Sequence, residues 1–317
     1  MDDLTKHKLY EYVGADTAQA EHIEKPQLSY VRDVARRFLS NRVAVISVAV
    51  LVLIALMAVI GPLMTSYDYR TTDVASVSEK LASEKGRAAL GPDSEHWFGV
   101  DTLGRDLWAR VWIGTRYSLL IGFAAALVQA LIGVLIGCIS GYFGGMVDVI
   151  IMRAVDIMDA IPYLIYVIII MIVLGSGFMP ILLALTLTGW LSMARLVRGQ
   201  ILALKSEDYI LAARNLDTKP VRIMLRHLIP NCMGIIIVSL SMAIPSAIFS
   251  EAFLSFLGIG LSAPLTSLGQ LISTGIREMR NYPYQLVIPS AVISLLMLSL
   301  QLIGDGLRDA VDPKLRK

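Results

Sequence analysis

Charged residues are scarce in this sequence, and their scarcity indicates the class of protein. Asp, Glu, Lys and Arg make up 17% of the 317 residues, whereas a soluble domain normally carries about 25%. Hydrophobic residues make up 56%, and the mean hydropathy is +0.65. The net charge of +2 is small, and basic residues are not interleaved with aromatic ones as they are in nucleic-acid-binding proteins. These proportions predict an integral membrane protein and argue against nucleic-acid binding.

Cysteine and histidine, which often bind transition metals, are also few. Cys138 and Cys232 lie in or beside apolar segments, without the spacing of a metal or redox site. The four histidines are widely scattered, at His7, His22, His96 and His227. The sequence therefore predicts no metal site, and we expect the two cysteines to fill space within the membrane.

The sequence contains no Gly-Lys pair. It therefore lacks the phosphate-binding loop G-x-x-x-x-G-K-[ST]. The glycine-rich stretch 141–145 has neither the lysine nor a preceding strand, and we expect it to end a helix at the membrane surface. No serine stands in a nucleophile-elbow pattern. We therefore expect no catalytic residue in this chain, which is predicted not to be an enzyme.

Long apolar stretches, by contrast, are abundant. Six of them reach or approach the roughly 20 residues that a spanning helix needs: 43–64, 118–141, 157–174, 180–194, 232–257 and 286–303. The fourth is short by this measure. The predicted fold is an all-α integral membrane protein with six transmembrane helices. The chain then divides into a tail 1–41, a first helix 42–64, a loop 65–116, a core 117–306 with five helices, and a tail 307–317.

Lysine and arginine are distributed unequally between the two sides of this predicted bundle. Six crossings place both termini on one side, which holds 19 of the 28 Lys and Arg, whereas the other holds 9. Positive residues accumulate in cytoplasmic loops. We therefore expect both termini in the cytoplasm. No cleavable signal peptide is predicted, and the first tail is either disordered or forms a short helix near residues 30–38.

A short, charged and regularly patterned segment interrupts the apolar stretches at 206–231. Two sets of apolar residues follow the i, i+3, i+4, i+7 spacing of a helix face: Tyr209, Ala212, Ala213 and Leu216, then Val221, Met224, Leu225 and Leu228. Residues 217–220 predict a turn with Pro220 in the first turn of a second helix. Pro230-Asn231 predicts a break before the fifth span. The segment is predicted to be a cytoplasmic helix–turn–helix.

This segment has two interpretations. It is either an amphipathic element lying on lipid or a docking element for another protein. Ala212 and Ala213 are too small to insert deeply into lipid, and small residues allow close approach between helices. The pattern favours docking.

Three features inside the predicted spans are candidates for a functional or packing role. Glu251 is an acid within the fifth span, and such residues are functional candidates by default; alternatively, it reaches water near the outer surface or caps a packing contact. Pro245 either kinks the fifth span to help open and close a pore or is static structure. Gly133-x-x-x-Gly137 in the second span predicts a helix-packing surface.

The outer loop carries a further candidate, Gly104-Arg105-Asp106. The segment 98–112 either forms a surface helix beneath a solute-binding protein or serves the fold, with Arg105 and Asp106 pairing to orient it. The second interpretation is favoured.

Five motifs, in order along the chain, resemble those of permease subunits of ABC importers. A-A-R-x-L at 212–216, followed by I-P-N at 229–231, resembles the family's EAA loop, and H-W-F-G-V-D-T-L-G-R-D at 96–106 looks like its FGTDxxGRD signature, continued by R-Y-S-L at 116–119. D-I-M-D-A-I-P at 156–162 is similar to the segment leading into the third span. E-A-F-L-S-F-L-G-I-G at 251–260 resembles EAxLSFLGLG, and 304–313 resembles GDxLRDxLDP. Only residues 1–28 and 71–90 fall outside the resemblance, which is to the C-type subunit of dipeptide/oligopeptide permeases.

The segment departs from the family's pattern at two positions. Leu211 stands where the family usually has Glu, and Asp217 stands where it usually has Gly. Asp is among the few residues that adopt positive φ at modest cost, so we expect the turn to survive. We hypothesise that Glu207, one turn earlier on the same helix, replaces the missing Glu.

The resemblance implies a type I importer bundle in a bacterial inner membrane. This subunit would pair with a second permease, two ATP-binding subunits and an extracytoplasmic solute-binding protein, and would carry di- or oligopeptides by alternating access. ATP and Mg²⁺ would be bound by the partner subunits, with no cofactor on this chain. A coupling loop at 205–230 would contact the ATPase, through the residues Glu207, Tyr209, Ala212, Ala213, Arg214, Leu216, Asp217 and Met224.

Other functions remain open at this point. The same machinery serves nickel chelates or glutathione in related permeases. A self-contained secondary transporter would show inverted repeats or charges deep in several spans, and neither is seen apart from Glu251.

Overall fold

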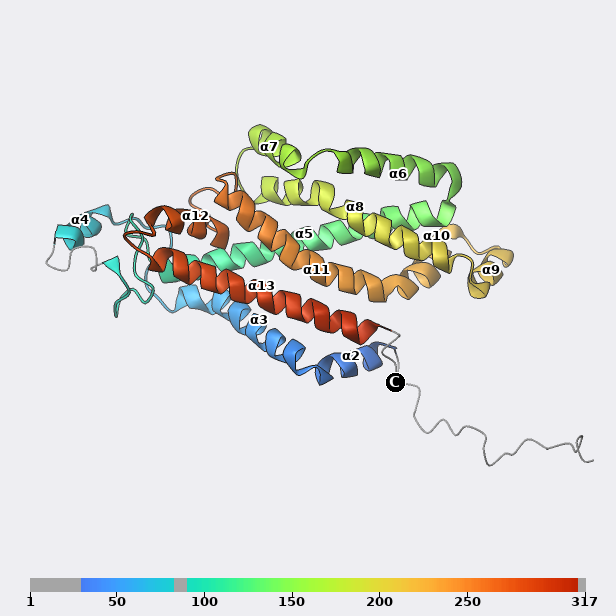
Figure 1. Cartoon of the computed structure of the whole chain (residues 1–317), viewed down its shortest axis with the longest axis horizontal. Coiled ribbons are helices and arrows are strands. Elements are labelled where there is room, and N and C mark those ends of the chain that lie inside the picture. The colour runs from blue at the N-terminus through green and yellow to red at the C-terminus, as the bar shows by residue number, and fades with distance from the viewer. Residues whose placement is uncertain (1–29, 83–89, 313–317) are drawn as a thin grey trace, which may run out of the picture.

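The computed structural model describes residues 30–82 and 90–312, which form a bundle of long helices running along one axis (Figure 1). Five helices are long and apolar enough to cross a membrane: α3 (Arg42–Ile60, extended by the 3₁₀ turn Gly61–Leu63), α5 (Leu107–Phe143), α8 (Phe178–Leu204), α11 (Ile229–Phe256) and α13 (Tyr284–Val311). The bent pair α6 (Gly145–Ala160) and α7 (Tyr163–Leu174) makes a sixth crossing when it is counted as one span. The chain is a multi-pass membrane protein with an all-α bundle.

Shorter helices cover the two ends of this bundle: α2 (Tyr30–Ser40), α4 (Val74–Ala82), α9 (Asp208–Asn215), α10 (Pro220–Ile223) and α12 (Leu268–Glu278). One end carries α4, α12 and the loop 90–106, and the opposite end carries α2, α9, α10 and the end of α13 (Figure 1). The alternative of a short helix near 30–38 is therefore confirmed. The question of residues 1–28 lies outside the described residues.

Helix α5 is at the centre of the bundle and packs against α3, α8 and α11. Glycines allow its close contact with α8. A methyl group on Gly133 would lie 2.6 Å from Met193 Cβ, and one on Gly137 would collide with the Ala194 carbonyl oxygen. The predicted packing role of these two glycines is confirmed, and the glycines at 144 and 145, with φ of 67° and 53°, end α5 as expected.

The third span is not the continuous helix predicted over 157–174. The chain bends by 80° between α6 and α7. Ile161 adopts an extended conformation, with φ −88° and ψ 126°, because a residue before proline is disfavoured in the helical region. At 12 residues, α7 is about 18 Å long, which is too short to cross a hydrocarbon core of about 30 Å alone.

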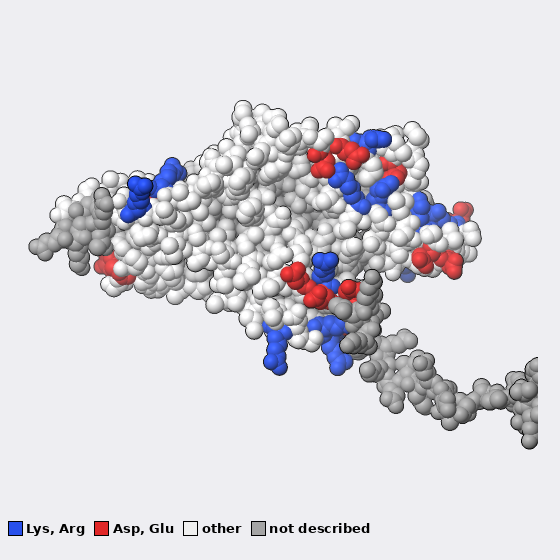
Figure 2. Space-filling view, in the orientation of Figure 1, with Lys and Arg blue, Asp and Glu red and all other residues white. Residues whose placement is uncertain are grey.

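The fourth span is longer than the predicted 180–194, because α8 continues well past that point. Arg195 and Arg198, which ended the apolar stretch, lie within the helix. Acidic side chains of α6 pair with both: Arg198 contacts Asp148 at 2.5 Å, and Arg195 contacts Asp159 at 2.9 Å and Asp156 at 3.3 Å. Figure 2 shows this group of opposite charges beside a largely uncharged central surface.

The fifth span is continuous with the segment before it. Helix α10 runs into a π-helical turn, Met224–Leu228, and that turn runs into α11. The predicted break at Pro230-Asn231 is wrong, since Pro230 lies in the first turn of α11, directly after the π-helical turn, and the helix continues through it. The Asn231 side chain donates a hydrogen bond to the His227 carbonyl at 2.5 Å. The segment α10 and the fifth span are thus one continuous helical stretch.

Two other boundaries differ from the prediction. Helix α5 begins inside the predicted loop 65–116, because Asp106 caps it at that point. The predicted surface helix over 98–112 is therefore wrong: residues 98–106 form a loop with an isolated bridge between Val100 and Asp106, and 107–112 begin α5. Helix α13 ends at Val311, so the predicted tail 307–317 starts inside a helix.

Candidate functional site

The segment between α8 and α11 projects from one end of the bundle as two short helices (Figure 1). Its first helix, α9, carries Asp208 in its first turn and Arg214 in its last. These charges match the dipole of the helix. Glu207 occupies the N-cap position without a side-chain capping bond. The expectation that Glu207 lies one turn along the same helix is therefore corrected: it precedes the helix.

The turn between the two helices forms as predicted. Asp217 has a φ of 56°, which is the left-handed conformation expected where the family usually has glycine. The Asp217 N–H donates to the Arg214 carbonyl at 3.0 Å, and the Thr218 N–H donates to the Ala213 carbonyl at 3.2 Å. Pro220 begins α10, again as predicted.

One side of this segment is buried against the bundle. Ile210, Ile223 and Leu228 are fully buried in a hydrophobic cluster that includes residues of α5, α8 and α11. Ala213 and Met224 belong to the same cluster. The expectation that these two side chains contact an ATPase does not fit this structure, because both pack inside the chain. They act here as anchors of the segment.

The opposite side is exposed and apolar. The exposed large side chains of this segment are Tyr209, Leu211, Leu216, Val221 and Leu225, and Leu216 is 80% exposed. Glu207, Ala212 and Asp217 are exposed as well. Partial burial raises the pKa of the Tyr209 phenol, and the Glu207 carboxylate adds to the rise. We call the five apolar residues the docking surface.

The predicted helix faces mix buried and exposed residues. Apolar side chains occur on both sides of α9 and α10, and the spacing rule therefore fits more than one stripe. The predicted stripe that begins at Tyr209 does not include Ile210 or Ile223. These two residues are fully buried and, like Ala213 and Met224, anchor the segment to the bundle. Leu211, noted only as a departure from the family's pattern, belongs to the docking surface.

Two basic side chains tie the segment to the end of α5. The Arg214 guanidinium lies over the Tyr142 ring, 4.8 Å from its centroid. The Lys205 ammonium donates to the Gly141 carbonyl at 3.2 Å. Arg214, predicted to contact a partner, thus contacts its own chain here, and the segment is connected to α5 as well as to α8 and α11.

Glu251 lies in the interior of the bundle, with no exposed surface. Its carboxylate accepts hydrogen bonds from the Ser118 hydroxyl at 3.1 Å and the Ser255 hydroxyl at 2.7 Å. Ser118 also accepts a bond from the backbone N–H of Leu268, at the start of α12, at 3.4 Å. The structure therefore fits the interpretation of a capped packing contact, which joins α5, α11 and α12. Pro245 is buried inside α11, and its role in gating stays a prediction.

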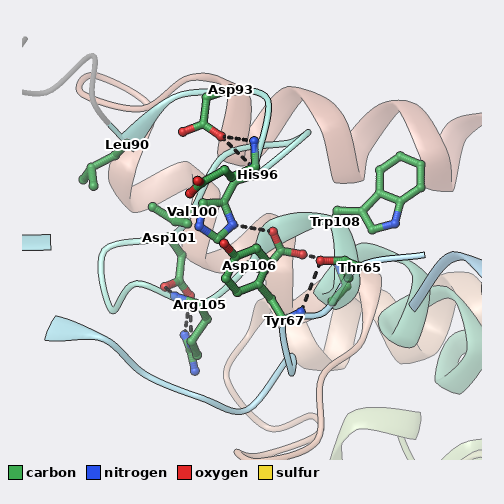
Figure 3. Close-up of polar contacts among 12 residues, drawn as sticks. Thr65, Tyr67, Leu90, Asp93, His96, Val100, Asp101, Arg105, Asp106 and Trp108 are labelled. Carbon is green, nitrogen blue, oxygen red and sulfur yellow. Dashed lines mark hydrogen bonds and ion pairs between the residues drawn. The ribbon is translucent and has the colours of Figure 1, made fainter. Parts of the chain in front are cut away.

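At the opposite end, two aspartates and their polar partners organise the loop before α5 (Figure 3). Asp106 accepts a hydrogen bond from the Ala109 N–H at 2.8 Å and contacts His96 Nδ1 at 2.8 Å. Asp101 contacts Arg105 at 2.7 Å and Arg110 at 2.6 Å. These bonds fix the entry of the chain into α5.

The predicted Arg105–Asp106 pair is not formed, because Arg105 pairs with Asp101 and Asp106 caps the helix. Gly104 has a φ of 77°, and a Cβ there would lie 2.5 Å from the Asp73 carbonyl oxygen. The favoured structural interpretation of residues 104–106 fits these contacts, with a different pairing.

A cavity of about 400 Å³ lies between α5, α7, α8 and α11. Hydroxyl side chains dominate its polar lining: Tyr163, Thr188, Ser192, Ser239, Ser246 and Ser250. Sequence reasoning singled out none of these residues. A signal was present in Ser239, Ser246 and Ser250, which are seven and four residues apart and so share one face of a helix.

Comparisons with known proteins agree with this architecture. Residues 133–317 match the family described as "Binding-protein-dependent transport system inner membrane component", and residues 29–82 match "N-terminal TM domain of oligopeptide transport permease C". The chain is 44% identical over 317 residues, covering 100% of both proteins, to the oligopeptide transport system permease protein OppC of Bacillus subtilis (strain 168). It is 42% identical to the dipeptide transport system permease protein DppC of the same strain, covering 94% of this chain and 90% of that protein.

A relative in Escherichia coli (strain K12), also an oligopeptide transport system permease protein OppC, is 42% identical, over 93% of this chain and 95% of that protein. Among solved structures, a chain of the MetNI methionine ABC transporter in an inward-facing conformation has a TM-score of 0.50 at 18% identity, covering 63% of this chain and 97% of that chain. At this identity the likeness concerns the fold alone.

Proposed function

The chain belongs to the family of binding-protein-dependent transport system inner membrane components, and from that premise we propose that it is a non-catalytic permease subunit of an ATP-driven ABC importer. Its cargo is di- or oligopeptides delivered by a solute-binding protein. The names of relatives that match nearly their whole length, OppC and DppC, support the peptide class.

The docking surface is the observation that carries this proposal. Five large apolar side chains are exposed on a segment whose other side is firmly buried. Apolar side chains clustered on a short projecting helix are typical of a segment that seats in the groove of a partner protein. The partner is an ATP-binding subunit, which holds ATP and Mg²⁺, and two such subunits serve this chain and a second permease.

The geometry explains how ATP hydrolysis on a partner would move this chain. The anchors Ile210 and Ile223 sit in one cluster with residues of α8 and α11. Because packed interfaces move as units, displacement of α9 carries the ends of both helices with it. The continuous α10–α11 connection transmits the same displacement along the fifth span.

The distribution of positive charge supports an orientation for the bundle. The end of the bundle with α2, α9 and the end of α13 carries most of the Lys and Arg of the described residues (Figure 2). By the positive-inside rule, this end is in the cytoplasm of a bacterial cell. The loop 90–106 then faces outward, toward the solute-binding protein.

Co-purification tests the proposal. The chain is tagged after Lys317, extracted gently from membranes, and its partners are identified. We expect a second permease and ATP-binding proteins in stoichiometric amounts. Leu216→Asp should release the ATP-binding proteins, whereas Leu63→Asp, also 80% exposed but at the other end, should not.

One result would contradict the proposal. A chain that purifies alone, and is active in liposomes without ATP, has no need of an ATPase. The segment 206–231 would then be an element lying on lipid.

A further inference from the structure

The cavity between α5, α7, α8 and α11 is lined by neutral polar groups. Of its lining residues, six carry hydroxyls, one is the amide Gln129, and the rest are Ala, Leu, Gly and Met. None of these side chains is charged at neutral pH. Thr188 and Ser192 lie near the middle of α8, and Ser239, Ser246 and Ser250 lie along the middle and later part of α11. We call these five residues the hydroxyl wall.

The hydroxyl wall differs from the surfaces that face lipid. On the same helices other directions are occupied by large exposed apolar side chains, such as Leu131 of α5 and Phe249 of α11. Phe249 adjoins Ser250, and Leu131 adjoins the cavity residue Ala130. Exposed apolar side chains and cavity-lining residues thus occupy neighbouring positions on the same helices.

Most hydroxyls of the wall have no protein partner in the described part of the chain. Ser250 donates to the Ser246 carbonyl at 2.9 Å, but no hydrogen bond is formed by the hydroxyls of Ser192, Ser239 and Ser246 among the described residues. Ser192 and Ser246 are exposed, so the cavity is open to the surface of this chain at these two residues. The Tyr163 hydroxyl, which lines the same cavity, is buried and likewise without a partner there. Polar groups without partners are not tolerated against hydrocarbon, but they are tolerated where they line a water-filled cavity.

Gln129 adds an amide to this lining. Its Nε2 donates to the Leu185 carbonyl at 2.9 Å, which fixes the side chain across the cavity. Gly189 makes room for it, because a Cβ at that position would collide with the amide. The second amide hydrogen is left for another acceptor.

From these contacts we propose that the hydroxyl wall is a binding surface for the peptide main chain on its way through the permease. This inference rests on the proposed function. Hydroxyls both donate and accept hydrogen bonds, so they match the alternating N–H and C=O groups of a peptide. A wall without charge prefers neither acidic nor basic side chains. This subunit therefore binds the peptide main chain and does not select peptides by the charge of their side chains.

Water access is measured first, in the assembled complex without peptide. Ser192→Cys and Ser246→Cys are made in a chain carrying Cys138→Ala and Cys232→Ala, and are labelled with a charged thiol reagent that reacts in water. Leu131→Cys and Phe249→Cys are the matched controls on the lipid side. The wall cysteines should react at least tenfold faster than the controls, and added peptide should slow them. Equal rates would overturn the proposal and show a dry contact with lipid or a second permease.

Transport selectivity is measured second. Replacing Ser192, Ser239 and Ser246 by Ala should raise the KM for neutral, acidic and basic tripeptides by a similar factor of several-fold, measured with equal amounts of assembled complex. Ser246→Asp should favour basic over acidic tripeptides by about tenfold. Unchanged KM values in the triple variant, or unchanged selectivity in the Ser246→Asp variant, would overturn main-chain recognition.

Failure of the proposed function has a different signature. In that case the unmodified complex shows no ATP-dependent uptake of any tripeptide, whatever the labelling rates are. Absence of uptake by the unmodified complex therefore indicates failure of the proposed function, whereas normal uptake with unchanged KM in the variants indicates failure of main-chain recognition alone.

Discussion

At the residue scale, Asp217 takes the conformation that the family's usual glycine would take at this turn. Its φ of 56° lies in the left-handed region, which Asp visits more readily than most residues. The two backbone hydrogen bonds across the turn, from Asp217 and Thr218, depend on this conformation. The departure from glycine therefore leaves the geometry of the docking segment intact.

Asp217→Val should destabilise the chain by about 1–3 kcal/mol, because a β-branched residue is strained at positive φ. Lys219→Val is the control, since Lys219 is exposed in the same turn and has a φ of −54°. Thermal unfolding of the detergent-solubilised complex gives the measurement. Equal losses in both variants would show that the backbone conformation at 217 is unimportant.

Glu251 is a buried carboxylate with two serine donors. The loss of stability in its variants should therefore increase as fewer of these hydrogen bonds are kept. Glu251→Gln preserves the shape and one acceptor oxygen, so it should cost roughly 1 kcal/mol. Glu251→Ala leaves a cavity and two unpaired hydroxyls, and should cost about 2–5 kcal/mol. The same unfolding assay separates them. If the Gln variant were the less stable, the negative charge itself would be essential.

At the element scale, α6 is held beside α8 largely by ion pairs of long side chains. Arg198 and Asp148 are the less exposed pair, and the Ser140 hydroxyl also donates to Asp148. Arg195 and its partners Asp156 and Asp159 are more exposed. The bend at Ile161-Pro162 separates this part from α7, and the ion pairs contribute to holding α6 in position along α8.

Arg198→Ala should destabilise the chain by roughly 1–2 kcal/mol, since it leaves the partly buried Asp148 carboxylate without its cation. Arg195→Ala should change stability by less than about 1 kcal/mol, as exposed pairs do. Unfolding is compared at low salt and at about 1 M NaCl, where screening should shrink the effect of Arg195→Ala most. An equal loss in both variants at both salt concentrations would contradict this ranking.

At the scale of the whole molecule, six crossings bring the described termini and the docking segment to one end of the bundle (Figure 1). The outer loop and α4 lie at the other end. This separation means that a single labelling experiment tests both the number of crossings and the orientation.

Ser206→Cys, in the exposed start of the docking segment, should react with an impermeant thiol reagent in inverted membrane vesicles and not in intact cells. Ser78→Cys, exposed on α4, should show the opposite pattern. Labelling of both from one side would contradict the six crossings. A reversed pattern would keep the fold and overturn the orientation inferred from positive charge.

Local chemistry accounts for what the sequence predicted correctly. Apolar runs located the spans along the chain, since a helix that crosses hydrocarbon must be largely apolar, but they did not show the bend in the third span or the full length of the fourth. The glycines of α5 marked the contact with α8, and Asp217 and Pro220 marked the turn, because each acts through its own backbone conformation. The motifs were sufficient to identify the family.

Only the tertiary structure decided which apolar face of α9 and α10 is buried, because both faces satisfy the same helical spacing and a partner surface resembles a core. It also decided that Arg195 and Arg198 lie within α8, where acids of another helix neutralise them. The cavity is a third case. Its hydroxyls come from α7, α8 and α11, and no local pattern in the sequence shows that these side chains line one cavity once the helices have packed.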